Sequence, residues 1–252
     1  MTAFDWFWLA LLAAVAVSIG SFVGVLVRRL PAGETPGGRS RCPRCGHALT
    51  PRDLVPLASW AALGGRCRHC RGPIGVFYPA VELAALGLAL WAAAAMTMAG
   101  WLVWATAVLG WTLLALTLID IRHYLLPDVL TLPLVPAGIA VNWALLRQPP
   151  LDAMLGAVVG YAAFVLIAWA YRRWRGREGM GAGDAKLLAG LGAWVGASGL
   201  PSLVLLASLL ALAAALAMQC LRGRLSLADR VPFGPFLAAG GWVVWLYGPF
   251  FG

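Results

Sequence analysis

Two aspartates lie at the ends of apolar runs, where their side chains could do chemistry. Asp120 directly follows the run 101–119, and Asp184 stands at the start of the run 185–198, after Gly181 and Gly183. Carboxylates at a membrane boundary are costly to desolvate and are candidates for function. Because glycine has no side chain, the backbone at 181–183 can bring Asp184 close to a partner or to an extended substrate. We therefore treat Asp120 and Asp184 as candidate catalytic residues.

A pair of carboxylates suits aspartic proteolysis. Two carboxylates that lie close together cannot both ionise easily, so they share a proton. The charged one can act as a general base on water, and the protonated one can donate to the scissile carbonyl. Each residue also has a structural interpretation: Asp184 as a helix N-cap after a glycine turn, and Asp120 as an interfacial acid paired with Arg122. If the apolar runs are taken as membrane helices, Asp120 and Asp184 lie at a similar depth in the membrane, which favours the catalytic pair.

Four of the five cysteines form two Cys-x-x-Cys pairs, Cys42 with Cys45 and Cys67 with Cys70. This spacing suits tetrahedral zinc with four thiolate ligands, which leaves no open position and therefore predicts a structural metal. Disulfides are the competing interpretation, and a reducing cytosol disfavours them. His47 or His69 could replace a thiolate, but we interpret both as loop side chains.

Two further acids deserve separate treatment. Asp128 opens the apolar run 129–146, where we expect a helix N-cap. Glu82 falls inside the run 77–95, where it could pair with an arginine, line a polar cavity or touch a ligand. The sequence does not decide between these three roles for Glu82.

Membrane helices must position these residues. Of the 252 residues, 62% are hydrophobic and 12% are charged, and this charged share is about half of that in a soluble domain. These values exclude an ordinary soluble enzyme and a disordered chain. Eight helices of about 20 residues need roughly 160 residues, which is close to the hydrophobic total. The sequence therefore predicts an all-α polytopic membrane protein with about eight transmembrane helices, over the runs 6–27, 77–95, 101–119, 129–146, 153–171, 185–198, 200–219 and 233–251.

The basic residues predict the orientation. With the N-terminus outside, 18 of the 19 Lys and Arg residues fall in inside loops, and only Arg147 falls outside. Cytoplasmic loops carry such an excess, so we expect Asp120 and Asp184 at the cytoplasmic side. No basic stretch precedes the first run, which we interpret as a retained helix and not a cleaved signal peptide. The predicted division is a first transmembrane helix at 1–27, a zinc-ribbon-like cytoplasmic loop at 28–76 and a seven-helix membrane peptidase domain at 77–252.

The ordered set of motifs resembles the bacterial type IV prepilin peptidases, which are membrane aspartic proteases of the Gly-x-Gly-Asp type. The resemblance extends over nearly the whole chain. The matching motifs are Ser-Phe at 21–22 through Arg-Leu-Pro at 29–31, the paired Cys-x-x-Cys knuckles with Pro-Leu-Ala-Ser-Trp at 56–60 between them, Tyr-Pro-Ala-Val-Glu-Leu at 78–83, Ile-Asp at 119–120 through Leu-Pro-Asp at 126–128, Gly-Ala-Gly-Asp-Ala-Lys at 181–186 and Pro-Phe-Gly-Pro-Phe at 232–236.

The resemblance implies an enzyme of the bacterial inner membrane with Asp120 and Asp184 as its catalytic pair. Its substrates would be type IV prepilins and the pseudopilins of type II secretion, cut after a glycine between a basic leader and an apolar helix. Many members also methylate the new N-terminal residue, usually phenylalanine, with S-adenosylmethionine, and the family links this activity to the cysteine loop. No nucleotide-type glycine motif identifies the residues that bind this cofactor, and the sequence does not give the oligomeric state.

Three other hypotheses remain. A proton-coupled transporter can also use membrane acids and a helix broken near glycines, but its acids tend to lie near the bilayer midplane. A membrane-anchored zinc-ribbon scaffold would tolerate Asn at both Asp120 and Asp184. Nucleic-acid binding is not expected, because the arginines are spread over four loops and form no compact patch with aromatic residues.

Overall fold

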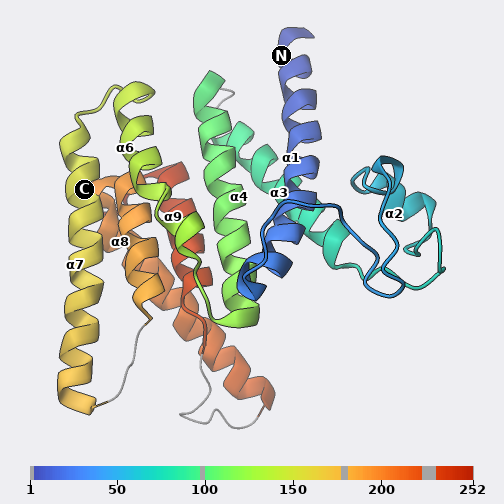
Figure 1. Cartoon of the computed structure of the whole chain (residues 1–252). Coiled ribbons are helices and arrows are strands. Elements are labelled where there is room, and N and C mark those ends of the chain that lie inside the picture. The colour runs from blue at the N-terminus through green and yellow to red at the C-terminus, as the bar shows by residue number, and fades with distance from the viewer. Residues whose placement is uncertain (1–2, 97–99, 177–180, 223–230, 252) are drawn as a thin grey trace. The chain divides into compact units, whose positions relative to one another are not determined.

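The computed structural model describes residues 3–96, 100–176, 181–222 and 231–251. Over these residues the chain is helical, with two isolated β-bridges and no strand. The helices are α1 (Ala3–Arg29), η1 (Leu30–Ala32), η2 (Pro51–Asp53), α2 (Ala58–Ala62), α3 (Phe77–Ala95), α4 (Gly100–His123), α5 (Asp128–Thr131), α6 (Leu134–Ala144), α7 (Pro150–Arg175), α8 (Ala182–Arg222) and α9 (Gly234–Tyr247), as Figure 1 shows. The predicted all-α class is confirmed.

Among the described residues, five helices are long and apolar enough to cross a membrane, namely α1, α3, α4, α7 and α8. The chain is therefore a multi-pass membrane protein, as its composition predicts. Each of the eight predicted apolar runs is helical over most of its length. The fourth run is divided between α5 and α6, the eighth is the 14-residue helix α9, and the sixth and seventh are joined in α8.

Helix α8 contains two of the predicted spans because it is broken at Gly196. An unbroken helix of its 41 residues would be about 60 Å long, which is twice the thickness of a bilayer core. Gly196 has φ 74° and ψ 172°, a conformation open mainly to glycine. The Ala197 N–H donates to Asp152 Oδ1 of α7 at 3.2 Å, so Asp152 caps the second half of α8. The chain turns back at this point (Figure 1).

The chain divides by its contacts into two compact units, Met1–Ala115 and Leu116–Gly252, with the boundary inside α4. In unit 1, α1 packs on α3 over a core of small and apolar side chains, and Trp111 Nε1 donates to the Ala85 carbonyl at 3.0 Å. Gly20 of α1 lies so close to α3 that an added Cβ would stand 2.6 Å from Glu82 Cα. Because Gly20 has no side chain, α1 can approach α3 closely at the position of Glu82. The predicted division at 27 and 76 stays a prediction.

In unit 2, glycines bring α7 and α8 into backbone contact. A Cβ added at Gly156 would collide with the Gly192 carbonyl oxygen, and one added at Gly192 would collide with that of Gly156. Gly160 approaches the Leu188 carbonyl in the same way. Small residues allow such close packing, which is a main source of helix association in membranes. This packing holds the first half of α8, and with it Asp184, in a fixed position within the unit.

Candidate active site and metal centre

Asp120 occupies the last turn of α4, where the residue is only 6% exposed. Its Oδ2 accepts a hydrogen bond from the Gly234 N–H at 3.0 Å, although the two residues are 114 positions apart. Gly234 begins α9, and a Cβ there would stand 2.6 Å from Asp120 Oδ2. A residue with a side chain could not bring its N–H this close without displacing the carboxylate. Gly234 therefore positions Asp120, a role that the sequence does not reveal.

Asp184 lies in the first turn of α8, after the glycines at 181 and 183. Because α8 begins at Ala182, Asp184 stands inside the helix and not at the capping position. An acid in the first turn interacts favourably with the helix dipole. Gly183 packs against Leu126, since an added Cβ would stand 2.9 Å from the Leu126 Cβ. The glycine predicted to allow a close approach thus does so, toward the segment that follows Asp120.

The two aspartates line one pocket in unit 2. The pocket contains about 630 Å³ of space not filled by atoms, including its open mouth. Asp120 lies close enough to Asp184 to interact with it electrostatically. The structure therefore places the predicted pair together, although the two residues belong to different helices. The full lining is Asp120, Tyr124, Leu125, Leu126, Asp128, Gly181, Ala182, Gly183, Asp184 and Lys186.

An ion pair at the same pocket was not predicted from the sequence. Lys186 Nζ donates to both carboxylate oxygens of Asp128, at 2.7 and 2.8 Å. The expected N-cap role of Asp128 is wrong, because Asp128 is the first residue of α5 and Pro127 holds the capping position. The Lys186 side chain is 30% exposed and that of Asp128 55% exposed, so water screens the pair. It joins the start of α5 to the start of α8 beside the two aspartates.

The four paired cysteines come together in unit 1 as predicted. The sulfur atoms of Cys42, Cys45, Cys67 and Cys70 all lie within 4.8 Å of one another, and Cys42 Sγ is 3.9 Å from Cys70 Sγ. Four thiolates around one zinc ion at about 2.3 Å have sulfurs ~3.8 Å apart. None of the four forms a disulfide in this structure. The cluster could hold a metal ion and is compatible with zinc.

The two Cys-x-x-Cys segments have the same backbone hydrogen bond. Cys42 N–H donates to the His47 carbonyl at 2.9 Å, and Cys67 N–H donates to the Gly72 carbonyl at 2.8 Å. The rings of His47 and His69 stack beside the cluster with centroids 4.3 Å apart. The histidines therefore support each other while the sulfurs converge. The N–H groups of Cys45 and then Arg44 lower the pKa of the Cys42 thiol, whereas burial and the neighbouring sulfurs of Cys42 and Cys70 raise the pKa of Cys45. Without a metal the cluster therefore favours one thiolate, and a bound cation would be needed to hold all four.

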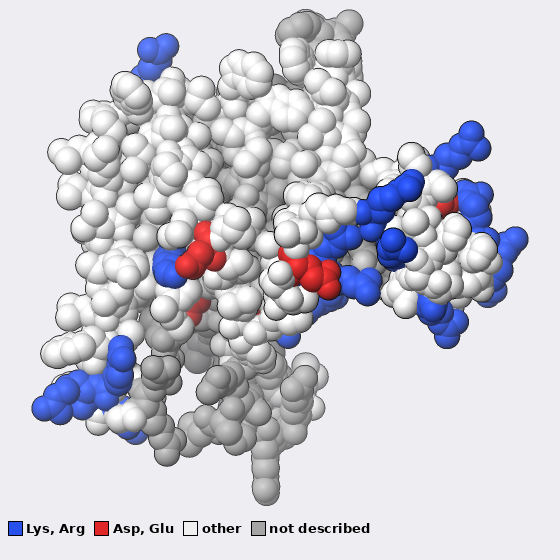
Figure 2. Space-filling model, viewed as in Figure 1, with Lys and Arg blue, Asp and Glu red and all other residues white. Residues whose placement is uncertain are grey.

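The rest of the cysteine loop is held by polar contacts around Asp53. Its carboxylate accepts hydrogen bonds from the hydroxyl and the N–H of Thr50 and from Arg68 Nε at 2.7 Å. These contacts, led by the Thr50 hydroxyl, lower the pKa of Asp53 to about 2. Most of the other charges on the loop are arginines, and Figure 2 shows them gathered around α2. The loop thus presents a strongly basic surface.

The fold and the site together define a class: a multi-pass helical membrane protein with a pair of aspartates in one pocket and a separate four-cysteine cluster. Two family models match the chain. The model of the type IV leader peptidase family matches residues 107–216, and that of the bacterial peptidase A24 N-terminal domain matches residues 14–96. The chain belongs to the type IV leader peptidase family.

Curated relatives are similar over almost the full length. A prepilin leader peptidase/N-methyltransferase of Burkholderia pseudomallei is 41% identical over 274 residues, covering 96% of this chain and 87% of the relative. Proteins of the same name from Aeromonas salmonicida and Pseudomonas aeruginosa are 39% and 41% identical, over 96% and 91% of this chain and 92% and 87% of the relative. No solved structure matches the chain.

Proposed function

We propose that this chain is a prepilin leader peptidase that also methylates the new N-terminus of its product. Two findings together carry the proposal. Relatives of that name match nearly the whole chain, and two aspartates from different helices line one pocket. The substrates are type IV prepilins and type II secretion pseudopilins, cut after the glycine that joins a basic leader to an apolar helix. Neither the family nor the relatives' names support the transporter alternative.

Asp120 and Asp184 carry the proteolysis in this proposal. One carboxylate removes a proton from water, and the other donates a proton to the oxygen of the scissile carbonyl. The hydrogen bond from Gly234 orients Asp120, and the helix start orients Asp184. A pocket with an open mouth gives water and an extended peptide access to both carboxylates. Proton sharing between the two acids then needs no other titrating group.

We place the site at the cytoplasmic side of the inner membrane. The C-terminal turn of α7 carries Arg172, Arg173 and Arg175, and the Asp184 turn follows it a few residues later. Arg147 precedes the other end of α7. Three arginines against one at opposite ends of a single helix support the orientation by the positive-inside rule. The basic loop of unit 1 suits contact with anionic lipid headgroups.

The cysteine cluster would hold a structural zinc ion through Cys42, Cys45, Cys67 and Cys70. Four thiolates saturate the metal, so it would stabilise the loop and take no part in proteolysis. S-adenosylmethionine would supply the methyl group for the second activity.

The test of the peptidase half is cleavage of a prepilin-like peptide by the full chain in detergent. Asp120→Asn and Asp184→Asn keep the size of each side chain and remove its acid function, so we expect each to lower the cleavage rate by at least about 10²-fold to 10⁴-fold. Asp152→Asn is the matched control in unit 2, because an amide oxygen still accepts from the Ala197 N–H. Equal cleavage by wild type and both site variants would refute the assignment.

A further inference from the structure

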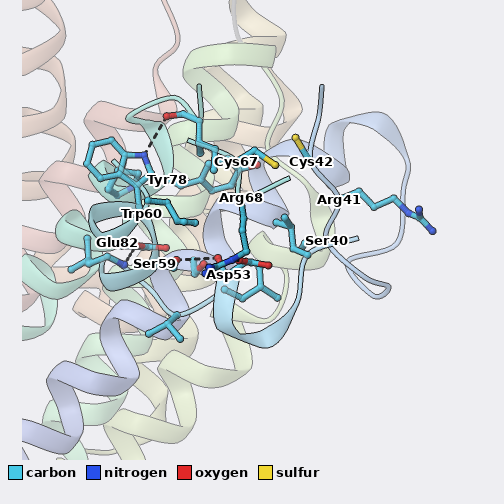
Figure 3. A pocket seen from close by; sticks show the side chains of 18 of the residues that line it. Ser40, Arg41, Cys42, Asp53, Ser59, Trp60, Cys67, Arg68, Tyr78 and Glu82 are labelled. Carbon is cyan, nitrogen blue, oxygen red and sulfur yellow. Dashed lines mark hydrogen bonds and ion pairs between the residues drawn. The ribbon is translucent and has the colours of Figure 1, made fainter. Parts of the chain in front are cut away.

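A second pocket lies wholly within unit 1, beside the cysteine loop (Figure 3). It is lined by residues of α1, the loop, α2 and α3, and contains about 900 Å³ of space not filled by atoms, including its mouth. Most of the lining is apolar, with a few polar groups among it. This is the usual character of a small-molecule site. The pocket shares no residue with the one that contains Asp120 and Asp184.

Glu82 of α3 is the unexpected group in this pocket. It is 5% exposed, and its Oε2 accepts a hydrogen bond from the Leu57 N–H at 2.7 Å. None of the described basic residues forms an ion pair with Glu82. A buried carboxylate without a cation is costly. Of the three roles left open by the sequence, the described residues therefore show no pairing of Glu82 with an arginine, and they place Glu82 in a mostly apolar cavity. A cationic ligand in this cavity would offset the cost of the buried charge.

The loop residue that meets Glu82 is itself strained. Leu57 has φ 57° and ψ −51°, a conformation that a residue with a side chain adopts only where its surroundings enforce it. Strained backbone of this kind gathers at binding sites. The bond from Leu57 to Glu82 fixes the start of α2 against α3.

Two aromatic rings of the pocket are held rigidly. Trp60 Nε1 donates to the Ile74 carbonyl at 3.2 Å, and the ring packs on Gly65, where an added Cβ would stand 3.0 Å from it. Tyr78 packs in the same manner on Gly24 of α1, with a corresponding distance of 2.9 Å. Figure 3 shows Trp60 and Tyr78 on the same side of the pocket as Glu82. Rigid aromatic faces bind flat rings by stacking and cations through their π systems.

Arg68 adds to the pocket a guanidinium that can bind an anion. Its Nε is bound to Asp53, which holds the guanidinium at the pocket wall. The terminal N–H groups of an arginine held in this way can still bind a carboxylate. The pocket thus combines a buried acid, fixed aromatic rings and an anchored guanidinium.

We propose that this pocket binds S-adenosylmethionine, with Glu82 recognising its positive charge. The proposal rests on the methyltransferase half of the proposed function. The ligand has a sulfonium and an ammonium for Glu82 and the aromatic rings, an adenine for stacking, and a carboxylate for Arg68. The pocket also lies within residues 14–96, apart from the part that matches the leader peptidase model. Two activities in one chain would then use two separate sites.

The same cation chemistry exists in the methyl acceptor, whose new N-terminus is an ammonium. Titration calorimetry on the full chain in detergent separates the two sources, with S-adenosylmethionine in one arm and a peptide beginning with phenylalanine in the other. Glu82→Gln is the informative variant, because its amide oxygen can still accept from the Leu57 N–H while the charge is lost. Glu34→Gln is the matched control, an exposed acid of the same unit that does not line the pocket.

We expect Glu82→Gln to weaken S-adenosylmethionine binding by at least about tenfold, the value of one hydrogen bond to a charged group, and Glu34→Gln to bind as wild type does. Unchanged binding by Glu82→Gln would overturn the proposal, and so would a loss confined to the peptide arm. If wild type cleaves a prepilin peptide but binds no S-adenosylmethionine, the inference fails while the peptidase half of the proposed function stands. Zinc content and thermal unfolding report whether each variant is folded.

A second measurement needs no variant. Ultraviolet cross-linking of radiolabelled S-adenosylmethionine to the wild-type chain, followed by peptide mapping, should label peptides that contain Trp60 or Tyr78. Label confined to residues 116–252 would contradict the proposal.

Discussion

The two units of this chain position their acids in different ways. In unit 2, Asp120 and Asp184 lie at helix ends, where Gly234 brings its backbone close to Asp120 and Gly183 packs against Leu126. In unit 1, Glu82 lies inside α3 and is reached by an irregular loop that a four-cysteine cluster ties together. A site at helix ends depends on helix packing, whereas a site under a loop depends on whatever folds the loop. The two sites should therefore fail under different perturbations.

Removal of metal should give the largest difference between the units. Small zinc domains often fold only when the metal is bound, and the segment from Cys42 to Cys70 has little other regular structure. We expect chelation, or Cys67→Ser, to abolish amide protection across residues 41–74 while the protection of α7 and α8 stays unchanged. Hydrogen exchange with mass spectrometry makes the comparison. A loop that stays fully protected without metal would show that the cysteine cluster is not what folds it.

A methyl group added at residue 234 should lower the peptidase activity of unit 2. Gly234→Ala places a Cβ against Asp120 Oδ2, so the carboxylate must move and lose its hydrogen bond. A misplacement of about 1 Å in an active site can cost on the order of 10²-fold in rate, and we expect a loss of cleavage of that order. Gly87→Ala is the control, since an added Cβ there meets nothing within 4 Å. Cleavage at the wild-type rate by Gly234→Ala would contradict the positioning role.

The ion pair between Asp128 and Lys186 should have the smallest effect. Both side chains are partly exposed, and pairs of this kind contribute about 0.2–1 kcal/mol. We expect Lys186→Met and Asp128→Asn each to lower cleavage by only a few-fold, roughly 1.4 to 5 times. A double-mutant cycle of cleavage rates measures their coupling. A loss as large as that of Asp184→Asn would instead give one of these residues a direct part in the reaction.

The types and spacing of residues predicted the cysteine cluster, the pair of aspartates and most of the fold. Cys42 with Cys45 and Cys67 with Cys70 could be predicted because each pair is local and the ligand geometry of zinc is fixed. Asp120 and Asp184 stood out because acids at the ends of apolar runs are rare. The N–H of Gly234 could not be predicted, since only the packing of α9 brings it to Asp120.

Three other features depend on tertiary structure in the same way. Asp128 was expected to cap a helix because capping is a local rule, but Lys186, which is 58 residues away, binds it instead. The turn at Gly196 could not be predicted, because it interrupts a nearly continuous apolar stretch. Its backbone is stabilised by a residue far away in the sequence, Asp152 of α7. Glu82 could be noticed in the sequence but not given a role, because its surroundings come from the loop and from α1.

The measurement that tests the two-site account most directly follows cleavage and methylation separately in the same preparations. The full chain, Asp120→Asn and Asp184→Asn would each be given an intact prepilin peptide and a pre-cut peptide that begins with phenylalanine. The account predicts that both variants lose cleavage of the intact peptide and still methylate the pre-cut one with S-adenosylmethionine. Loss of methylation of the pre-cut peptide by folded, zinc-containing variants would contradict separate sites, and retained cleavage would contradict the catalytic pair.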